Sequence, residues 1–414
     1  MVNALTELGS TARRPQLVVL GLAFAAMFAS GPGQSFVIAV FVDELLVDTG
    51  LSRSAFSLLY AGATVVSAIV VSRLGPAADR LGLRAIWAAV AVGLALACGL
   101  ASLVTGAVTA LAALSVLRAF GQGSFPLVAT LLVSRAFGGR RGQAMALASL
   151  GITASSVVLP PLCVLLVVEL GWRDAYRTLG LGVLVLLLPL ALLLREPRRE
   201  DGSQGGAPVR RGPRALRRSR RMPRLTVPSN RARRLLLVLA APPLLMTAVI
   251  FHSTALLGER GLSLTEAGVA LSLLGVASLG GTLVAGAVAD RVTSRLLLAV
   301  MAGLLTAAHL VLLVPAKPAA YAGFVLLGAG GGFFGVAGGV VWPRTYGLAE
   351  IGRLQGTSFA VQIAAAAAGP LPLAVSDALL GRFWPALVGL AAYGALAVAV
   401  ALRWREPRIV RGPR

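Results

Sequence analysis

This sequence of 414 residues carries very little charge for its length. Asp, Glu, Lys and Arg make up 13% of the residues and hydrophobic residues make up 57%, whereas a typical soluble domain has about 25% charged residues. No soluble core could bury this much apolar surface. The scarcity of charge therefore excludes an ordinary soluble protein and predicts a chain that lies in lipid.

Cysteine and histidine are also scarce, with two of each. Cys98 and Cys163 both lie inside apolar runs, so neither a disulfide framework nor a zinc site is expected. The glycine-rich residues 328–335 lie within an apolar run with no strand before them, which excludes a dinucleotide loop. No phosphate-binding loop or nucleophile–base set is visible. We therefore predict no enzyme activity, no metal and no cofactor.

Twelve apolar runs are long enough to cross a bilayer, which takes roughly 20 residues. They predict an all-α membrane protein with twelve transmembrane helices. The first run is too long for a cleavable signal peptide, so we expect it to be a retained span. The predicted spans are residues 17–41, 55–74, 85–104, 107–134, 144–168, 175–194, 235–257, 266–289, 296–314, 319–342, 356–380 and 383–402.

The basic residues are distributed unevenly between the two sides of these spans. One set of connections holds 31 of the 38 Lys and Arg, the opposite set holds six, and Arg118 lies within a span. The positive-inside rule places the larger set and both termini in the cytoplasm. The net charge of +22 thus reflects membrane topology and not nucleic-acid binding. The arginine-rich composition is typical of a bacterial protein, so we expect a multi-pass protein of the bacterial cytoplasmic (inner) membrane.

The chain also contains an internal repeat. Residues 51–52 and 75–80 recur at 262–263 and 286–291, an offset of 211, and 195–198 recur at 405–408. Three matches at nearly one offset predict two pseudo-symmetric six-helix bundles, as in several transporter folds. We expect the bundles at residues 1–195 and 233–414. Residues 196–232, rich in Arg, Pro, Gly and Ser, should form a cytoplasmic linker.

The loop after the second span carries Gly-Pro-Ala-Ala-Asp-Arg-Leu-Gly-Leu-Arg at residues 75–84. This segment resembles the corresponding loop of the major facilitator superfamily, although Leu83 replaces its first basic residue. The resemblance implies a secondary transporter whose cytoplasmic side is held shut by a contact of Asp79 with Arg135 or a helix N-terminus. The alternative is an ordinary turn aspartate with topology-setting arginines. The residues expected in this latch are Gly75, Asp79, Arg80, Gly82, Arg84, Arg135, Asp290 and Arg291.

Arg118 is the strongest candidate for contact with a substrate. It lies eleven residues into its span, or about 16 Å deep at 1.5 Å per residue. No carboxylate lies at that depth, so an anionic substrate group is a natural partner for the guanidinium. The alternative is a structural arginine satisfied by helix carbonyls and hydroxyls. Further candidates that could line a cavity, or could merely pack or kink helices, are Gln34, Ser35, Tyr60, Gln122, His252 and Gln362.

Residues 252–263 are similar to bacterial carriers of the monocarboxylate and oxalate–formate type. The resemblance implies a small organic anion as substrate and alternating access as the mechanism. The expected partners are this substrate, the lipid bilayer and a coupling proton, with the monomer as functional unit and no nucleic acid. The alternatives are an efflux transporter of drugs or apolar compounds and a non-transporting membrane sensor on the same fold.

Overall fold

The computed structural model describes residues 10–137, 141–194, 230–289, 291–346 and 351–404. Within these ranges the chain is helical, and twelve spans are long and apolar enough to cross a membrane, which confirms the predicted count. The helices of the first half are α2 (Ser10–Ala29), η1 (Gly31–Gly33), α3 (Ser35–Thr49), α4 (Arg53–Leu81), α5 (Leu83–Ser102), α6 (Ala107–Leu117), η2 (Arg118–Ser124), α7 (Phe125–Ala136), α8 (Arg141–Leu170), α9 (Trp172–Leu187) and η3 (Pro189–Leu193).

The second half begins at Asn230, inside the range 196–232 expected for the linker. Residues 195–229 lie outside the described residues, so the predicted limits of the two bundles and of the linker stay a prediction. The helices of the second half are α11 (Asn230–Phe251), α12 (Ser253–Gly258), α13 (Leu264–Ala289), α14 (Ser294–Val311), α15 (Lys317–Tyr346), α16 (Ile351–Ala368), α17 (Pro370–Leu380) and α18 (Trp384–Leu402).

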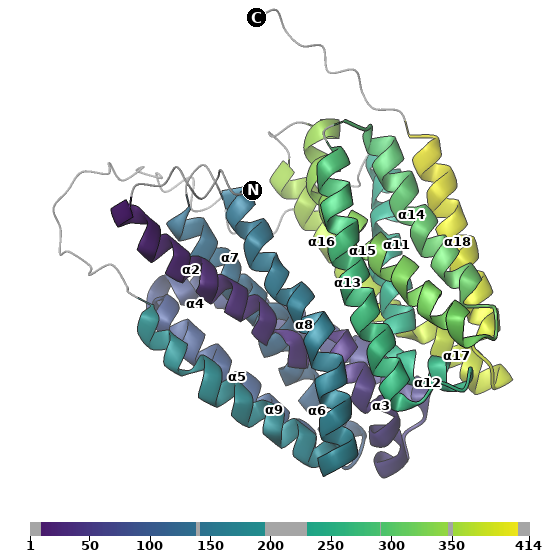
Figure 1. Cartoon of the computed structure of the whole chain (residues 1–414), viewed down its shortest axis with the longest axis horizontal. Helices are drawn as coiled ribbons and strands as arrows, with labels where there is room; N and C mark the ends of the chain where they lie inside the picture. Colours follow the sequence, from purple (N-terminus) through teal and green to yellow (C-terminus); the bar gives the residue numbers. More distant parts are fainter. Residues whose placement is uncertain (1–9, 138–140, 195–229, 290, 347–350, 405–414) are drawn as a thin grey trace, which may run out of the picture.

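The two halves form two six-helix bundles, as predicted (Figure 1). The bundles meet near α3, α8, α12 and α13 and diverge toward the opposite end. We call this opposite end, where α2 begins and α18 ends, the terminal end of the molecule. The ribbons of the two bundles thus lie farther apart at the terminal end than at the end where they meet.

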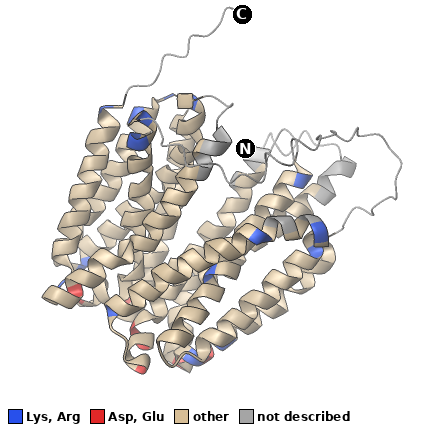
Figure 2. Ribbon diagram, turned by 180° about the vertical axis from the view of Figure 1, so that it is seen from behind, with Lys and Arg blue, Asp and Glu red and all other residues tan. Residues whose placement is uncertain are grey.

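The carboxylates mark the end at which the bundles meet. In Figure 2 the ribbon of the described residues is coloured red for Asp and Glu only at that end, which we call the acidic end. Their placement confirms that no described carboxylate side chain lies in the middle of a span. The described carboxylates are Asp43, Glu44, Asp48, Glu169, Asp174, Glu259, Glu266 and Asp377.

Small residues allow α8 and α13 to pack closely across the two bundles. A Cβ on Gly275 would lie 2.6 Å from Ser156 Oγ, so only glycine permits this approach. Ser272 Oγ donates a hydrogen bond to Val157 O at 2.8 Å, from the second bundle to the first. Small residues and hydroxyls of this kind are the usual contacts between helices in a membrane.

The repeat is visible in how α4 and α13 begin. Ser52 Oγ accepts a hydrogen bond from Ala55 N at 3.2 Å, and Ser263 Oγ accepts one from Glu266 N at 3.2 Å. Both serines therefore cap their helices in the usual manner. The two halves differ at the next position, where the first half has Arg53 and the second has a leucine.

The structure corrects three expectations about continuity. Helix α4 continues to Leu81 and ends at Gly82, whose φ is 86°, so Asp79 lies in the last helical turn and not in a loop. The seventh span, expected at 235–257, is interrupted at His252. The fourth span contains a π-helical segment, η2, that begins at Arg118.

Candidate substrate-binding site

Two irregular helical segments, η1 and η2, position Arg118. Pro32 and its neighbouring glycines break the first span at η1. A Cβ on Gly33 would lie 2.2 Å from Leu117 O, and one on Gly121 would lie 2.7 Å from Gly33 Cα. The two backbones are therefore in direct contact. This contact fixes the start of η2, and with it Arg118, against the break in the first span.

The π-helical geometry of η2 also changes the direction in which its side chains point. Ser124 Oγ donates to Ala119 O, five residues earlier, at 2.6 Å. A π-helical turn holds one residue more than an α-helical turn, so it rotates the side chains that follow it. Such turns are frequent at functional sites because they present side chains that a regular helix would not.

Arg118, Tyr60 and Ser35 form one hydrogen-bonded cluster. Arg118 Nη1 donates to the Tyr60 hydroxyl at 2.5 Å, and Arg118 Cζ lies 4.1 Å from the centre of the Tyr60 ring. The Tyr60 hydroxyl lies 2.5 Å from Ser35 Oγ. A guanidinium can only donate, so the Tyr60 oxygen accepts from Arg118. Either hydroxyl can be the donor in the contact of Tyr60 with the half-buried Ser35.

Two donors of Arg118 have no partner. The Arg118 side chain is fully buried, and its Nε and Nη2 atoms make no hydrogen bond among the described residues. These two N–H groups lie on one edge of the planar guanidinium, in the geometry that a carboxylate accepts with two parallel bonds. Leaving a buried charged donor unsatisfied is costly, so this edge has the chemistry of a site for an anion.

The three glutamines predicted for the site, Gln34, Gln122 and Gln362, are not part of this hydrogen-bonded cluster. Gln34 Nε2 donates to Ser30 Oγ at 3.2 Å, within the break of the first span. Gln122 is a half-buried residue of η2 itself. Gln362 Nε2 donates to Ser358 Oγ at 2.8 Å, one turn earlier on its own helix. The structure therefore brings Tyr60 and Ser35 to Arg118 but shows no glutamine in contact with its guanidinium.

His252 belongs to a different network at the acidic end. Its buried ring lies in the break between α11 and α12, and Nε2 lies 2.9 Å from Pro370 O. A carbonyl can only accept, so Nε2 carries the proton of this bond. The neighbouring Phe251 ring lies 4.4 Å from the Tyr60 ring. His252 is thus separated from Arg118 by an aromatic contact between the two bundles.

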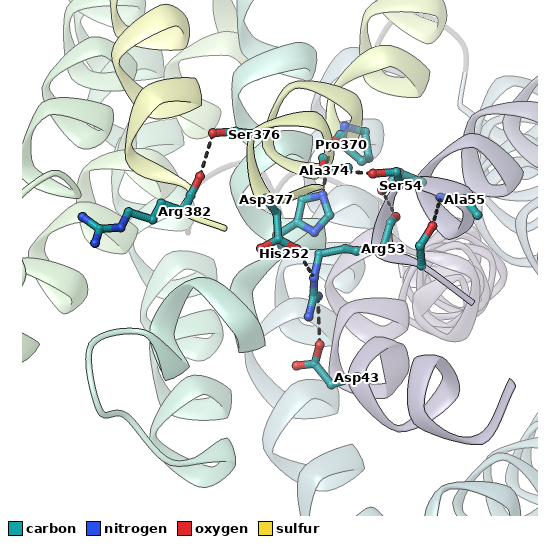
Figure 3. A network of polar contacts seen from close by, with 12 residues as sticks. Asp43, Arg53, Ser54, Ala55, His252, Pro370, Ala374, Ser376, Asp377 and Arg382 are labelled. Atoms are coloured by element: carbon teal, nitrogen blue, oxygen red, sulfur yellow. Dashed lines mark hydrogen bonds and ion pairs between the residues drawn. The ribbon is translucent and has the colours of Figure 1, made fainter. Parts of the chain in front are cut away.

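Sequence reasoning did not identify the main ion pairs of the acidic end. Arg53 contacts Asp43 at 2.9 Å and Asp377 at 3.2 Å (Figure 3). Ser54 Oγ donates to Ala374 O at 2.9 Å. The sequence shows only that these charges lie at span ends, and nothing in it pairs positions more than 300 residues apart.

The same end holds a partly buried ionisable pair, Glu259 and Arg260, between α12 and α13. Burial raises the pKa of Glu259, and the charge of Arg260 and the Phe383 N–H partly offset this. Burial lowers the pKa of Arg260. Arg260 donates to Leu256 O at 2.5 Å and to Leu312 O, which ties α12 to the end of α14.

The residues predicted for a cytoplasmic latch cluster at helix ends near the terminal end. Gly75 and Asp79 lie on α4, but their side-chain surroundings, like the whole of Asp290, lie outside the described residues. Arg80, Arg84, Arg135 and Arg291 are exposed, and Gly82 ends α4 with a positive φ. A groove of about 560 Å³ beside Arg84 is lined mainly by apolar residues of α5 and η3. The latch itself stays a prediction.

The comparison with known families decides the membership of the chain. The family model described as Major Facilitator Superfamily matches residues 22–370, which is most of the sequence. The chain belongs to the major facilitator superfamily. Its family and fold indicate a transporter, which is consistent with its twelve apolar helices.

Solved structures of this superfamily share the whole architecture at low identity. A bacterial homolog of the human lysosomal transporter Spinster, inward-facing and unoccupied, is 16% identical with a TM-score of 0.70, covering 95% of this chain and 97% of that one. The nucleoside transporter NupG is 12% identical with a TM-score of 0.70, covering 95% and 100%. A D-xylose-proton symporter is 16% identical with a TM-score of 0.70, covering 93% and 96%. No curated protein sequence matches the chain.

Proposed function

We propose that this member of the major facilitator superfamily moves a small organic anion, such as a monocarboxylate, by alternating access. The unpartnered edge of Arg118 carries the proposal. Its buried Nε and Nη2 donors have no hydrogen-bond partner among the described residues, while Nη1 donates to Tyr60. A carboxylate would accept from both of these donors and neutralise the buried charge, which no small neutral ligand would do.

The anion can reach this edge only when the bundles move. The guanidinium is fully buried in the present conformation, and the Tyr60 ring covers one of its faces. Tyr60 also packs on Phe251 of the second bundle, with ring centres 4.4 Å apart. A change in the angle between the bundles would therefore shift Tyr60 and open the cover over Arg118. Ser35, half-buried and bonded to Tyr60, would be the first donor that the anion meets.

The distribution of acids favours an anion over a cationic drug. An efflux site for cations needs a carboxylate near the middle of the membrane, and the described carboxylate side chains lie at the acidic end. A buried arginine with free donors would repel a cation. A sensor on the same fold would need no such buried charge, because it has no anion to carry.

The positive-inside rule supports one orientation for this transporter. It places the terminal end, with the arginine-rich connections, in the cytoplasm of a bacterial cell and the acidic end outside. The present conformation is then closed outward and corresponds to an inward-facing state. In this proposal Asp79 contacts Arg135 in the outward-facing state, where the contact holds the cytoplasmic side shut. A coupling proton is part of the same proposal.

Thermal unfolding of the purified protein with small carboxylates, amines and sugars tests the proposal. A ligand at 100 times its dissociation constant stabilises the folded state by about 2.7 kcal/mol. We expect carboxylates alone to raise the melting temperature of the wild type and of Arg173→Gln, whose arginine pairs with Asp48 at the surface 3.3 Å away. They should not stabilise Arg118→Gln. Stabilisation by amines or sugars, with none by carboxylates, would contradict the proposal.

A further inference from the structure

The residues at the start of α4 make three contacts with the second bundle. Arg53 Nε contacts Asp377 Oδ2 at 3.2 Å, and Arg53 Cζ lies 6.0 Å from the Phe383 ring. Ser54 Oγ donates to Ala374 O at 2.9 Å. All three contacts cross from one bundle to the other, and those with Asp377 and Ala374 can be followed in Figure 3. They must break whenever the bundles separate at the acidic end.

The partners of Arg53 divide between the two bundles. Asp43, on α3, belongs to the same bundle as Arg53, and Asp377, on α17, belongs to the other. A movement of the bundles as rigid bodies keeps the first ion pair and breaks the second. Asp43 would therefore keep the arginine charge paired in the open state. This arrangement lowers the cost of opening compared with a single buried pair, which would leave an uncompensated charge.

Helix α17, which carries the acceptors Ala374 and Asp377, is held in place by His252 and Phe383. His252 Nε2 donates to Pro370 O at the first turn of α17, the helix that carries Ala374 and Asp377. The centre of the His252 ring lies 5.8 Å from that of the Phe383 ring. The position of α17 is thus fixed within the second bundle. The backbone that carries Asp377 is therefore held in place by contacts that do not involve Arg53.

We propose that Arg53, Ser54, Ala374 and Asp377 form a gate at the acidic end that stabilises the conformation closed at that end, with Asp43 as the partner that Arg53 keeps on opening. This inference rests on the alternating-access part of the proposed function and not on the identity of the substrate. The Arg53 side chain is 19% exposed and that of Asp377 31%, so water screens the pair only in part.

The gate can be tested through the reactivity of a cysteine that it covers. Thr254 is buried, and its hydroxyl contacts Ala39 O of the other bundle at 3.4 Å. The labelling rate of Thr254→Cys with a maleimide scales with the fraction of molecules open at the acidic end, even when this fraction is small. The native Cys98 and Cys163 are buried, and the protein without Thr254→Cys gives the background rate.

We expect Asp377→Asn to raise this rate about three- to fivefold, the upper part of the range for an ion pair that contributes up to about 1 kcal/mol. Asp43→Asn is the matched control, because it removes the same charge from the same arginine without affecting a contact between bundles. It should leave the rate unchanged or lower it, because opening would then leave Arg53 without its remaining carboxylate. Lys317→Gln, which breaks a 2.9 Å pair with Glu266 inside the second bundle, should leave the rate within about twofold.

The experiment is run without substrate, so its outcome does not depend on the anion site. Equal rates for Asp377→Asn and Asp43→Asn, whether raised or unchanged, would overturn the gate. A raised rate for Asp377→Asn alone would support it even if the transported solute is not an anion.

Discussion

Two arginines of the first bundle, Arg118 and Arg53, have opposite surroundings. Arg118 is fully buried, has one hydroxyl partner, Tyr60, and keeps two donors vacant. Arg53 is partly exposed and contacts a carboxylate of each bundle, Asp43 and Asp377. Arg118 thus has the features of a site that a ligand completes, and Arg53 those of a contact that a movement breaks. What distinguishes the proposed roles of the two arginines is therefore which bundle their partners belong to, more than how deeply each side chain is buried.

The first prediction concerns the orientation, on which the terms inward and outward depend. A cysteine at Ser203, in the predicted cytoplasmic linker, should not react with a membrane-impermeant maleimide added to intact cells. A cysteine at the exposed Thr105, in the connection of α5 to α6, should react fully. The reverse pattern would place Arg53 and its partners inside the cell, and the gate would then face the cytoplasm.

The second prediction would disrupt the support of Arg118 without touching its side chain. Gly33→Ala places a methyl group 2.2 Å from Leu117 O, where two backbones must separate. Overpacking of this kind costs about 1–3 kcal/mol, so we expect a lower melting temperature and lost carboxylate binding. Gly99→Ala is the control, because nothing lies within 4 Å of its added methyl group. A Gly33→Ala protein as stable as Gly99→Ala would argue against the close contact of η1 and η2.

The third prediction sharpens the role of Tyr60. Tyr60→Phe keeps the ring beneath the guanidinium but removes the oxygen that accepts from Arg118 Nη1. Loss of one hydrogen bond to a charged group should weaken carboxylate affinity about tenfold, at the lower end of its usual contribution. Tyr393→Phe loses a phenol bonded to Leu237 O, away from this cluster, and should bind normally in the same titration. Equal affinities of the two variants would exclude Tyr60 from the site.

The smallest expected effect concerns the gate. Ser54→Ala removes the hydrogen bond to Ala374 O and should raise the labelling rate of Thr254→Cys about twofold, since such a bond contributes near 0.5 kcal/mol at its weakest. Ser57→Ala removes a bond to Arg53 O within the same helix and should have no effect. A larger change for Ser57→Ala than for Ser54→Ala would mean that the rate reports the stability of α4.

Features that depend on local composition could be read from the sequence. Apolar runs bounded by charges predicted the twelve spans, and the recurrence of Ser52 and Ser263 predicted equivalent helix starts in the two halves. The mid-span position of Arg118 also followed from counting residues along one helix. These properties repeat or extend within a single segment, so a single sequence contains them.

Features that depend on packing could not be read from it. The π-helical turn after Arg118 arises where Gly33 and Gly121 meet, and the break at His252 accompanies its bond to Pro370 O. The pairing of Arg53 with Asp377 joins positions from opposite ends of the chain. Each depends on contacts between helices, which the spacing of residues along one helix does not encode.

A carboxylate titration of two variants tests the central claim most directly. Arg118→Gln and Arg53→Gln remove the same charge from the same bundle, once at the proposed anion site and once at the proposed gate. Calorimetry on folded, monodisperse protein should show that Arg118→Gln loses at least about 1.5–3 kcal/mol of binding free energy, the contribution of a hydrogen bond to a charged group. Arg53→Gln should bind no more weakly than the wild type, because a weaker gate can only raise the fraction of molecules in which the anion reaches Arg118. Normal binding by Arg118→Gln, or loss of binding by Arg53→Gln alone, would contradict this assignment of the two arginines.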